Sequence, residues 1–399
     1  MIPFNKPYLT GNETLYIEQA VQTGKISGNG LFTQLCQTYF EEHFGFQKCL
    51  LTTSCTDALE MAAILCNVQP GDEVIIPSYT FVSTALAFVR QGATIIFADS
   101  YNNHPNLNAD LIESLITDRT KVIVPVHYAG VACDMAKIMQ LANKYNLLVV
   151  EDAAQAIDSY YISNTLSNNS GEEENKKIAL GSIGHFATFS FHETKNIISG
   201  EGGMLVINDE RFIHRAEIIW EKGTNRAEFF RGEVNKYGWI DIGSSFLPSE
   251  VIAAFLWAQI ENLDDIQKRR KKLWHIYNEG LQINAKKGVF SLPLLPDYAT
   301  NNAHMFYLNC NSLEVRSKMI AYLKQNDILA VFHYLSLHSS EYYINKHDGR
   351  ELPNCDMFAD CLVRLPLFYN LKEEDVLYIV GLINDFTTNN LSESAYRKY

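Results

Sequence analysis

A lysine, an aspartate and a group of small polar residues are the side chains in this sequence that could do chemistry together. Lys195 lies in the segment FHETKN, between an apolar strand-like segment and a glycine-rich turn. Asp152 closely follows the apolar run LLVV, so its carboxylate could face a cationic ring nitrogen. Ser54, Cys55 and Thr56 precede a helical segment, where free backbone amides and the helix dipole suit a phosphate group.

Each of these features has a simpler structural explanation when it is taken alone. A lone lysine after a strand is usually solvated surface, Asp152 could cap a helix, and residues 54–56 could form an ordinary helix cap. Ser190, shortly before the lysine, could donate to a phosphate or cap a strand end. Together, a phosphate cradle, a strand-end aspartate and a lysine beyond a later strand are what pyridoxal 5′-phosphate requires. The combination therefore predicts this cofactor.

Alternating strands and helices are expected to position these groups. Helical segments at 81–90, 111–116 and 135–145 alternate with short apolar strands at 73–76, 94–98, 121–126 and 147–150. This order predicts crossover connections and a mainly parallel sheet covered on both faces. A further strand is expected at 187–191, and residues 200–208 are expected to form a glycine-rich turn followed by another strand. Ligands of such sheets bind beyond the carboxyl ends of the strands, where Asp152 and Lys195 are expected.

The second half of the chain predicts a smaller domain. A long helix at 250–281, with the basic run KRRKK on a solvated face, is expected to bridge the two parts. We therefore predict a large cofactor-binding domain over 1–250 and the bridging helix with a small C-terminal domain over 251–399. Residues 162–177, which are rich in Asn, Ser and Glu, are expected to form a mobile surface insertion without a function of its own.

Composition excludes several classes of protein. The net charge is −13 over 399 residues, so a general affinity for nucleic acid is not expected. Eight cysteines occur without a Cys-x-x-Cys pair, which argues against a disulfide framework or a zinc site and favours reduced thiols in the cytoplasm. No apolar run approaches the roughly 20 residues of a membrane helix, and the N-terminus does not resemble a secretory signal. No metal and no membrane contact are expected.

These segments, taken in order, resemble the DegT/DnrJ/EryC1/StrS sugar aminotransferase family. The matching motifs are PGDEVIIPSYTFVSTA, VIVPVHYAG, VVEDAAQA, FSFHETKN and GEGG, and the resemblance covers the whole chain apart from 162–177. It implies an α/β protein of fold type I, the aspartate-aminotransferase-like fold of PLP-dependent transferases. That fold has a large, mixed but mainly parallel sheet domain and a smaller C-terminal α/β domain. The resemblance also implies a homodimer with shared active sites.

The resemblance implies a role for each matching residue. Lys195 would form the Schiff base with pyridoxal 5′-phosphate and afterwards move a proton, and Asp152 would pair with the pyridine nitrogen. Gln155 would bind the ring hydroxyl, and Phe81 would stack on the ring. The phosphate would be held by Ser54, Cys55, Thr56 and Ser190. Residues assigned to the substrate, for which a structural role is equally expected, are Ser27, Arg226, Arg231, His333, Tyr334 and His338.

Within the family, the closer resemblance is to the branch that aminates dTDP-4-keto-6-deoxy-D-glucose. SCTDALEMAA, EKGTNR, FFRG, DIGSSF and ILAVFHY carry it. It implies that L-glutamate is the amino donor and that the product is dTDP-4-amino-4,6-dideoxy-D-galactose, used for enterobacterial common antigen, lipopolysaccharide or O-antigen. Ser245-Phe246-Leu247 stands where many members carry Asn-Tyr-Arg, which puts one phosphate contact from the neighbouring subunit in doubt.

Other activities remain open from the sequence. The same chemistry could give the gluco epimer, because the sequence does not decide which face of the substrate receives the proton. It could also act at C3 of a 3-keto sugar and give a 3-amino sugar nucleotide. A sugar dehydratase of this fold would carry histidine at the lysine position, so Lys195 argues against it. A PLP-binding module without catalysis would not need Lys195, Asp152 and Gln155 together.

Overall fold

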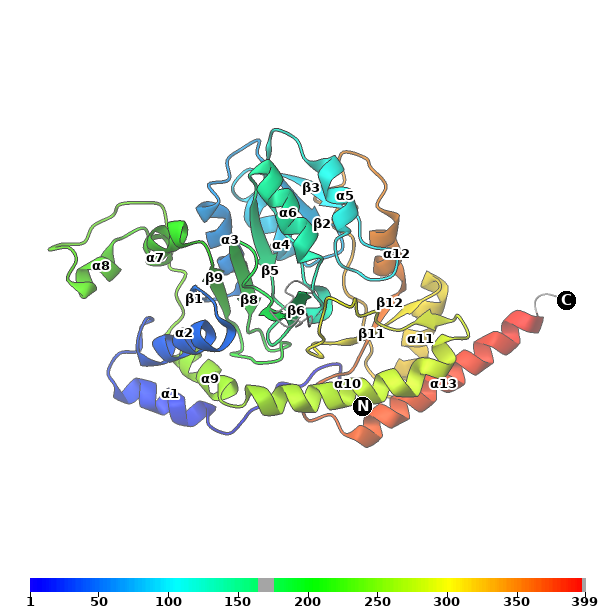
Figure 1. Ribbon diagram of the computed structural model, residues 1–399. Coiled ribbons are helices and arrows are strands. Elements are labelled where there is room, and N and C mark those ends of the chain that lie inside the picture. The colour runs from blue at the N-terminus through cyan, green and yellow to red at the C-terminus, as the bar shows by residue number, and fades with distance from the viewer. Residues whose placement is uncertain (164–175, 397–399) are drawn as a thin grey trace, which may run out of the picture.

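The computed structural model describes residues 1–163 and 176–396. Its centre is a seven-stranded sheet (Figure 1). All neighbouring strands from β8 to β3 are parallel, and β9 is antiparallel to both of its neighbours, β1 and β8. The predicted mainly parallel sheet is therefore confirmed. In spatial order the strands are β1 (Lys48–Thr52), β9 (Gly203–Ile207), β8 (Phe186–Ser190), β5 (Leu148–Asp152), β4 (Thr120–Ile123), β2 (Glu73–Pro77) and β3 (Thr94–Ala98).

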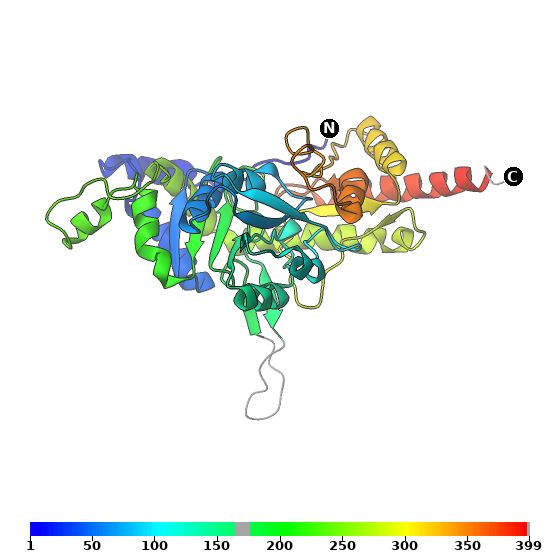
Figure 2. The same cartoon turned by 90° about the horizontal axis from the view of Figure 1, so that it is seen from above.

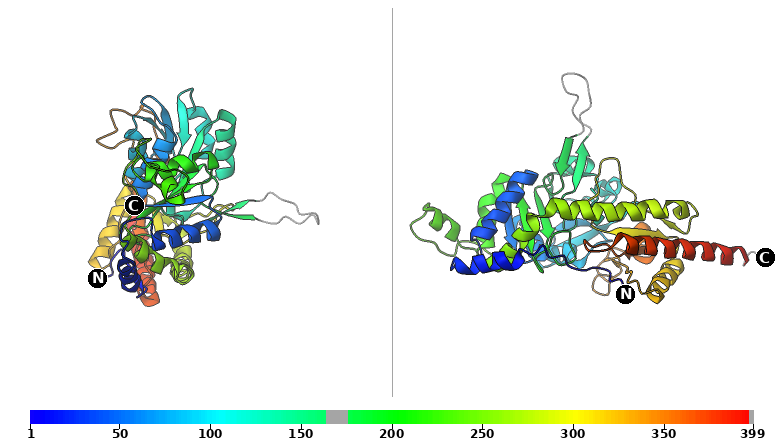
Figure 3. Two further views of the ribbon diagram at one scale, coloured as in Figure 1. Left: turned by 90° about the vertical axis from the view of Figure 1, so that its left-hand side faces the viewer. Right: turned by 90° about the horizontal axis from the view of Figure 1, so that it is seen from below.

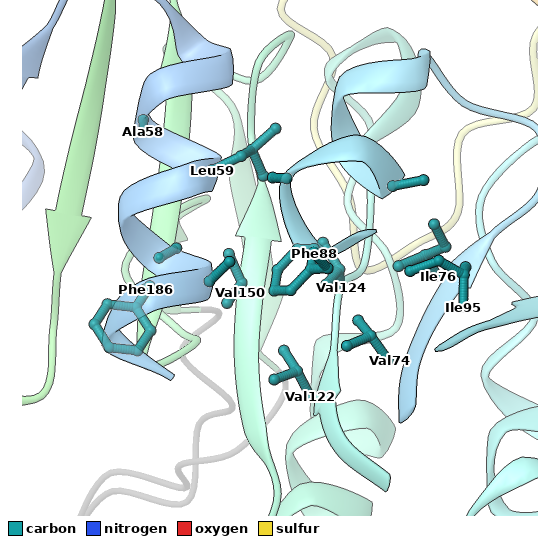
Figure 4. Packing of buried hydrophobic residues seen from close by; sticks show 14 of the residues in the cluster. Ala58, Leu59, Val74, Ile76, Phe88, Ile95, Val122, Val124, Val150 and Phe186 are labelled. Atoms are coloured by element: carbon teal, nitrogen blue, oxygen red, sulfur yellow. The ribbon is translucent and has the colours of Figure 1, made fainter. Parts of the chain in front are cut away.

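Helices cover both faces of this sheet. Successive residues of a strand point to opposite sides, so a strand of continuous apolar residues needs a covering layer on each side. In β2, Val74 and Ile76 belong to one core cluster, which Figure 4 shows, and Ile75 belongs to another. The first face is covered by α3 (Cys55–Leu65), α4 (Val82–Val89) and α7 (Ile213–Trp220). The other face is covered by α2 (Leu31–Phe44), α5 (Ala109–Ile112), α6 (Met135–Tyr145) and α9 (Glu250–Ile260).

The C-terminal part is built around a second, three-stranded sheet, β10-β11-β12. The long helix α10 connects the two sheets (Figure 3). The first residues of α10 pack with α2 and α9 in the core of the large sheet, and its later residues pack with β11 in the core of the small sheet. The elements are α10 (Leu263–Ala285), β10 (Phe290–Ser291), β11 (Phe306–Cys310), α11 (Leu313–Gln325), α12 (Pro353–Cys361), β12 (Leu362–Leu365) and α13 (Glu373–Tyr396). The division at residue 250 into two domains stays a prediction.

The single helix predicted over 250–281 is wrong, because the chain forms two helices with a break at Glu261 and Asn262. At the break, the Asn262 backbone N–H donates to the Gln259 carbonyl, three residues back, instead of continuing the α-helical pattern. The Asn262 side chain donates to the Ala258 carbonyl (2.9 Å). These bonds satisfy the end of α9 and let α10 start in a new direction.

The prediction that the basic run KRRKK of α10 lies on a solvated face is wrong for Arg270, which is only 3% exposed. Its guanidinium donates to the backbone carbonyls of Ala303, His304 and Leu367. Burial lowers the pKa of Arg270 to about 10, which still leaves the side chain charged at neutral pH. Arg270 therefore ties α10 to two loops of the C-terminal part.

Three peripheral features complete the chain. Helix α1 (Glu13–Gln22) packs on α9. The antiparallel pair β6 (Tyr160–Ser163) and β7 (Lys176–Ala179) projects from the body (Figure 2). Four residues of the predicted insertion at 162–177 therefore lie in paired strands, and its remaining residues, 164–175, lie outside the described part of the chain. Helix α8 (Arg226–Arg231) projects at the end opposite α13 (Figure 1).

All eight cysteines are free, and seven of them are buried. Burial raises the pKa of each thiol, Cys55 included. Within residues 1–163 and 176–396, the structure contains no helix with the length and hydropathy needed to cross a membrane.

Candidate active site

One cavity of about 510 Å³ collects most of the predicted site residues. It lies beyond the carboxyl ends of β5 and β8, where a parallel sheet is expected to bind its ligand. Its volume is in the range of small-molecule and cofactor sites. The predicted residues that line it are Ser54, Cys55, Thr56, Phe81, Asp152, Gln155, Ser190, Lys195, His333 and Tyr334.

Lys195 enters the cavity from the turn between β8 and β9. The pKa of Lys195 is lowered to about 8, chiefly by desolvation and to a smaller extent by nearby Arg364, while Cys55 and Asp152 oppose the shift. An ordinary lysine, with a pKa near 10.4, is almost entirely protonated at neutral pH. At a pKa of about 8, roughly a tenth of Lys195 is neutral at pH 7, so its amine is available as a nucleophile and base.

Asp152 is the last residue of β5 and is 5% exposed. Desolvation raises its pKa, and two hydrogen bonds oppose this: the Thr84 hydroxyl donates to Oδ2 (2.7 Å) and the Ala154 N–H donates to Oδ1 (3.2 Å). The alternative of a helix cap is wrong, because residues 153–159 form turns. A buried carboxylate supported by two donors is suited to a cationic partner.

The start of α3 forms one end of the cavity. The Ser54 hydroxyl caps this helix by accepting from the Asp57 N–H (3.0 Å), so the capping interpretation also holds. Cys55 and Thr56 are the first helical residues, whose N–H groups have no partner within the helix. A Cβ added at Gly203 would lie 2.4 Å from the Cys55 nitrogen, so β9 approaches this turn closely only because residue 203 is glycine. This end suits a phosphate group.

Aromatic and amide groups line the middle of the cavity. Phe81 precedes α4 with 55% of its surface exposed, and its ring centre is 5.7 Å from that of Tyr334. Gln155 accepts from the Ala129 N–H (2.6 Å) and donates to the Tyr334 hydroxyl (3.2 Å). These contacts fix the Gln155 amide, with its donor directed toward Tyr334 and its oxygen toward the backbone. The middle of the cavity therefore offers a planar face and an oriented donor to a ring.

The remaining predicted residues do not line this cavity. Ser27 is exposed in the loop before α2. Arg226 and Arg231 are the two ends of the projecting helix α8. His338 lies outside the cavity, with its Nδ1 2.8 Å from the Ser78 hydroxyl oxygen. Within one chain, these four side chains are not brought together with Lys195.

Sequence reasoning missed several residues of the cavity, among them Phe4, Thr84 and Arg364. A detectable signal existed for Arg364, which stands in LVRL, where an arginine among apolar strand residues must be buried or turned outward. The sequence carried no such signal for Thr84, because threonine is common in the first turn of a helix. Phe4 comes from a segment almost 150 residues before Asp152, and nothing local relates the two.

Comparison with known proteins agrees with this geometry. Residues 7–384 match the model of the DegT/DnrJ/EryC1/StrS aminotransferase family. The chain is 31% identical to GDP-perosamine synthase of Escherichia coli O157:H7, covering 96% of this chain and 98% of that protein. It is 30% identical to the spore coat polysaccharide biosynthesis protein SpsC of Bacillus subtilis (strain 168), covering 96% of both chains.

A solved structure with the same architecture is the aminotransferase TlmJ from Streptoalloteichus hindustanus. It superposes with a TM-score of 0.85 at 26% identity, covering 98% of this chain and all of that chain. The predicted fold type I is thereby confirmed, and so is the prediction that the protein is an aminotransferase. DesV of S. venezuelae, solved in complex with a ketimine intermediate, also matches (26% identity, TM-score 0.83, 97% of this chain and 98% of that chain), and the sugar aminotransferase Spr1654 of Streptococcus pneumoniae, which has the same fold, is solved in a PLP form. The chain belongs to the DegT/DnrJ/EryC1/StrS aminotransferase family, and its cofactor is pyridoxal 5′-phosphate.

Proposed function

We propose that the protein transfers the amino group of L-glutamate to C4 of dTDP-4-keto-6-deoxy-D-glucose. The product would be dTDP-4-amino-4,6-dideoxy-D-galactose, a precursor of cell-surface polysaccharide. The observation that carries the proposal is the placement of Lys195 and Asp152 in one cavity with the start of α3. The choice of sugar depends on the resemblance of segments such as EKGTNR and ILAVFHY to the branch with this substrate.

The residues of the cavity divide the work. The cofactor, when bound, takes up an amino group from one substrate and gives it to another. Lys195 is the nucleophile and the base, and its lowered pKa suits it to carry a proton at neutral pH. Asp152 pairs with the ring nitrogen, Gln155 binds the ring hydroxyl and Phe81 covers the ring face. Ser54, Cys55, Thr56 and Ser190 bind the phosphate.

Two copies of the chain would complete the site. The segment at 223–245, which contains α8, projects from the body and exposes apolar side chains, including Trp239 (85%), Ile240 (55%) and Ile242 (55%) (Figure 1). A second copy packed on this surface would bury them and could carry Arg226 and Arg231 to the neighbouring cavity. There, either arginine could bind the diphosphate of the substrate. We assign the enzyme to the cytoplasm, which its eight free cysteines favour.

The product of purified enzyme tests this function. Incubation with dTDP-4-keto-6-deoxy-D-glucose and L-glutamate should give an axial amine at C4 by NMR. An equatorial amine would identify the gluco epimer instead, and amination at C3 of a 3-keto substrate would identify the other alternative. A GDP-linked 4-keto-6-deoxy sugar is the comparison substrate, because one relative is named GDP-perosamine synthase.

Lys195→Ala is the control for the chemistry. It should remove the visible absorption of the lysine-bound cofactor and reduce turnover by about 10³-fold or more, because both the nucleophile and the base are lost. A variant that keeps full turnover would refute the role of Lys195. If the wild-type enzyme removes water from the sugar substrate and transfers no amine, it is a dehydratase instead.

A further inference from the structure

Asn196 directly follows Lys195, and groups from the second half of the chain bind its side chain. The residue is 5% exposed. Its Nδ2 donates to Gln267 Oε1 (2.7 Å) and to the Asn302 carbonyl (2.9 Å), and its Oδ1 lies 2.9 Å from His304 Nδ1. Both hydrogens of the amide and its oxygen are therefore used. The backbone next to Lys195 is thus tied to α10 and to the segment before β11.

The proton positions in this network follow from the partners. The Asn302 carbonyl can only accept, so the amide nitrogen of Asn196 must face it and the amide oxygen must face His304. An amide oxygen also only accepts, so His304 Nδ1 carries a proton and donates it. Desolvation, together with the charges of Lys195 and Arg364, lowers the pKa of His304 well below its usual value. The ring is therefore neutral at physiological pH, in the tautomer whose proton faces Asn196.

Residues 301–304, which supply two of these partners, form a rigid support. Asn302 is fully buried, and its Nδ2 donates to two backbone carbonyls of the turn after β5, including that of Gln155 (2.8 Å). A Cβ added at Gly130 would lie 2.1 Å from Asn302 Oδ1, so only glycine lets that turn pack so closely on the support. Arg270 holds two further carbonyls of the segment. The support is therefore fixed to both parts of the chain.

The turn that carries Lys195 has little regular structure of its own. Residues 191–202 connect β8 to β9 without a helix or a strand. Within the turn, the Lys195 N–H donates to the His192 carbonyl (2.9 Å), and the Ser199 N–H donates to the Phe191 carbonyl (2.7 Å). A long side chain reaches a defined position only when its backbone and its neighbours are held by packing and hydrogen bonds. The Asn196 amide supplies such a hold beside Lys195.

We propose that Asn196 and His304 together are positioning residues for Lys195. A base must lie within hydrogen-bond distance of the proton that it moves, so even a small displacement of its backbone lowers turnover. This inference rests on the proposed function, because it requires that Lys195 is the base. Since residues 301–304 lead into β11, it also gives the C-terminal sheet a part in placing the lysine amine.

Two replacements of the His304 ring test this. His304→Phe keeps the shape of the ring and removes the donor, whereas His304→Asn can place an amide N–H where Nδ1 was. In the half-reaction with L-glutamate, His304→Phe should lower kcat by about 100-fold and change KM by less than about threefold, because the amine is displaced and substrate binding is not. His304→Asn should restore kcat to within about fivefold of the wild type, since the hydrogen bond to Asn196 is regained.

Amide hydrogen exchange gives a readout that does not depend on turnover. In the protein without cofactor, the amides of Lys195 and Ser199 should exchange faster in His304→Phe than in the wild type, because the turn opens more often. In His304→Asn they should exchange at the wild-type rate. Asn196→Ala should reproduce the effects of His304→Phe. The double variant should lose no more kcat than the worse single variant, since the two residues act as one unit.

His185→Phe is the matched control. The Nδ1 of His185 also makes one hydrogen bond, accepting from the Val149 N–H (3.0 Å), but this ring lies at the amino end of β8, outside the cavity. His185→Phe should change neither kcat nor the exchange of the Lys195 and Ser199 amides.

The outcomes separate the inference from the proposed function. An equal loss of kcat in His304→Asn and His304→Phe, or unchanged exchange of the Lys195 amide in His304→Phe, would overturn the inference and leave the proposed function intact. If His304→Phe does not fold, Asn196→Ala decides by the same two measurements, because it removes the other partner of the bond. Full turnover of Lys195→Ala would overturn the proposed function together with the inference.

Discussion

At the scale of single residues, Thr84 controls the charge of Asp152. Its hydroxyl donates to Asp152 Oδ2 (2.7 Å), so the neighbouring Thr80 hydroxyl, 3.0 Å away, must donate to Thr84. Burial raises the pKa of Asp152, and this donor opposes the rise. Thr84→Val should therefore raise the pKa of Asp152 further, because the carboxylate loses a hydrogen bond that favours its charged form.

The pH profile of kcat/KM measures that change. As pH falls, activity should be lost at a higher pH in Thr84→Val than in the wild type, because Asp152 becomes protonated sooner. Thr84→Ser keeps the hydroxyl and is the matched control. Identical acid limbs for the valine and serine variants would show that the hydroxyl does not set the charge of Asp152.

Residue types alone could not identify every member of the site. Lys195, Asp152 and Ser54 were predictable because each follows a strand or precedes a helix at the edge where such sheets bind ligands. The buried state of Arg270 was not predictable, because its three carbonyl partners lie more than 30 residues away in the sequence. Arg364 is similar, since its contact with Phe4 joins the two ends of the chain.

At the scale of elements, Glu250 joins two helices. It is 1% exposed at the start of α9, and its carboxylate accepts from the N–H groups of Gly30, Phe32 and Thr33 at the start of α2. Glu250→Gln replaces an acceptor oxygen with an amide donor facing these donors. The local stability of α2 should fall by about 3 kcal/mol, because a charged hydrogen bond is lost and a buried donor is left unpaired.

Amide hydrogen exchange can measure this loss locally. The amides at 30–33 should exchange about 100-fold faster in Glu250→Gln, as the opening free energy falls. Glu18→Gln, on the exposed face of α1, should leave these amides unchanged. Unchanged protection in Glu250→Gln would mean that the start of α2 is held by its packing and not by the carboxylate.

The elements were more predictable than their junctions. The strands predicted at 73–76 and 94–98 and helix α6 lie at nearly their observed bounds, because periodicity and length decide such segments. Strand β1 was not predicted, and the strand predicted at 121–126 ends at Ile123. The break between α9 and α10 was not found, since apolar residues continue across it and its cause is the backbone geometry at Asn262. Periodicity in the sequence reports which side of a helix is buried, and it does not report a change of helix axis.

At the scale of the whole molecule, the exposed apolar segment at 223–245 predicts self-association. Ile240→Asp should place a charge in the proposed interface and shift the protein toward a monomer of 45.3 kDa in sedimentation velocity, with a loss of activity. Ile283→Asp is the matched control, because Ile283 is 77% exposed on α10, away from this segment. A wild type that is fully active as a monomer would refute shared active sites.

The eight cysteines bear on how this enzyme can be studied. With every thiol pKa raised by burial, none is expected to react readily with alkylating reagents near neutral pH while the fold is intact. A cysteine introduced at a surface position would thus be the preferred target of a fluorescent or spin label. Distances between such labels could be followed during turnover without first removing the native cysteines.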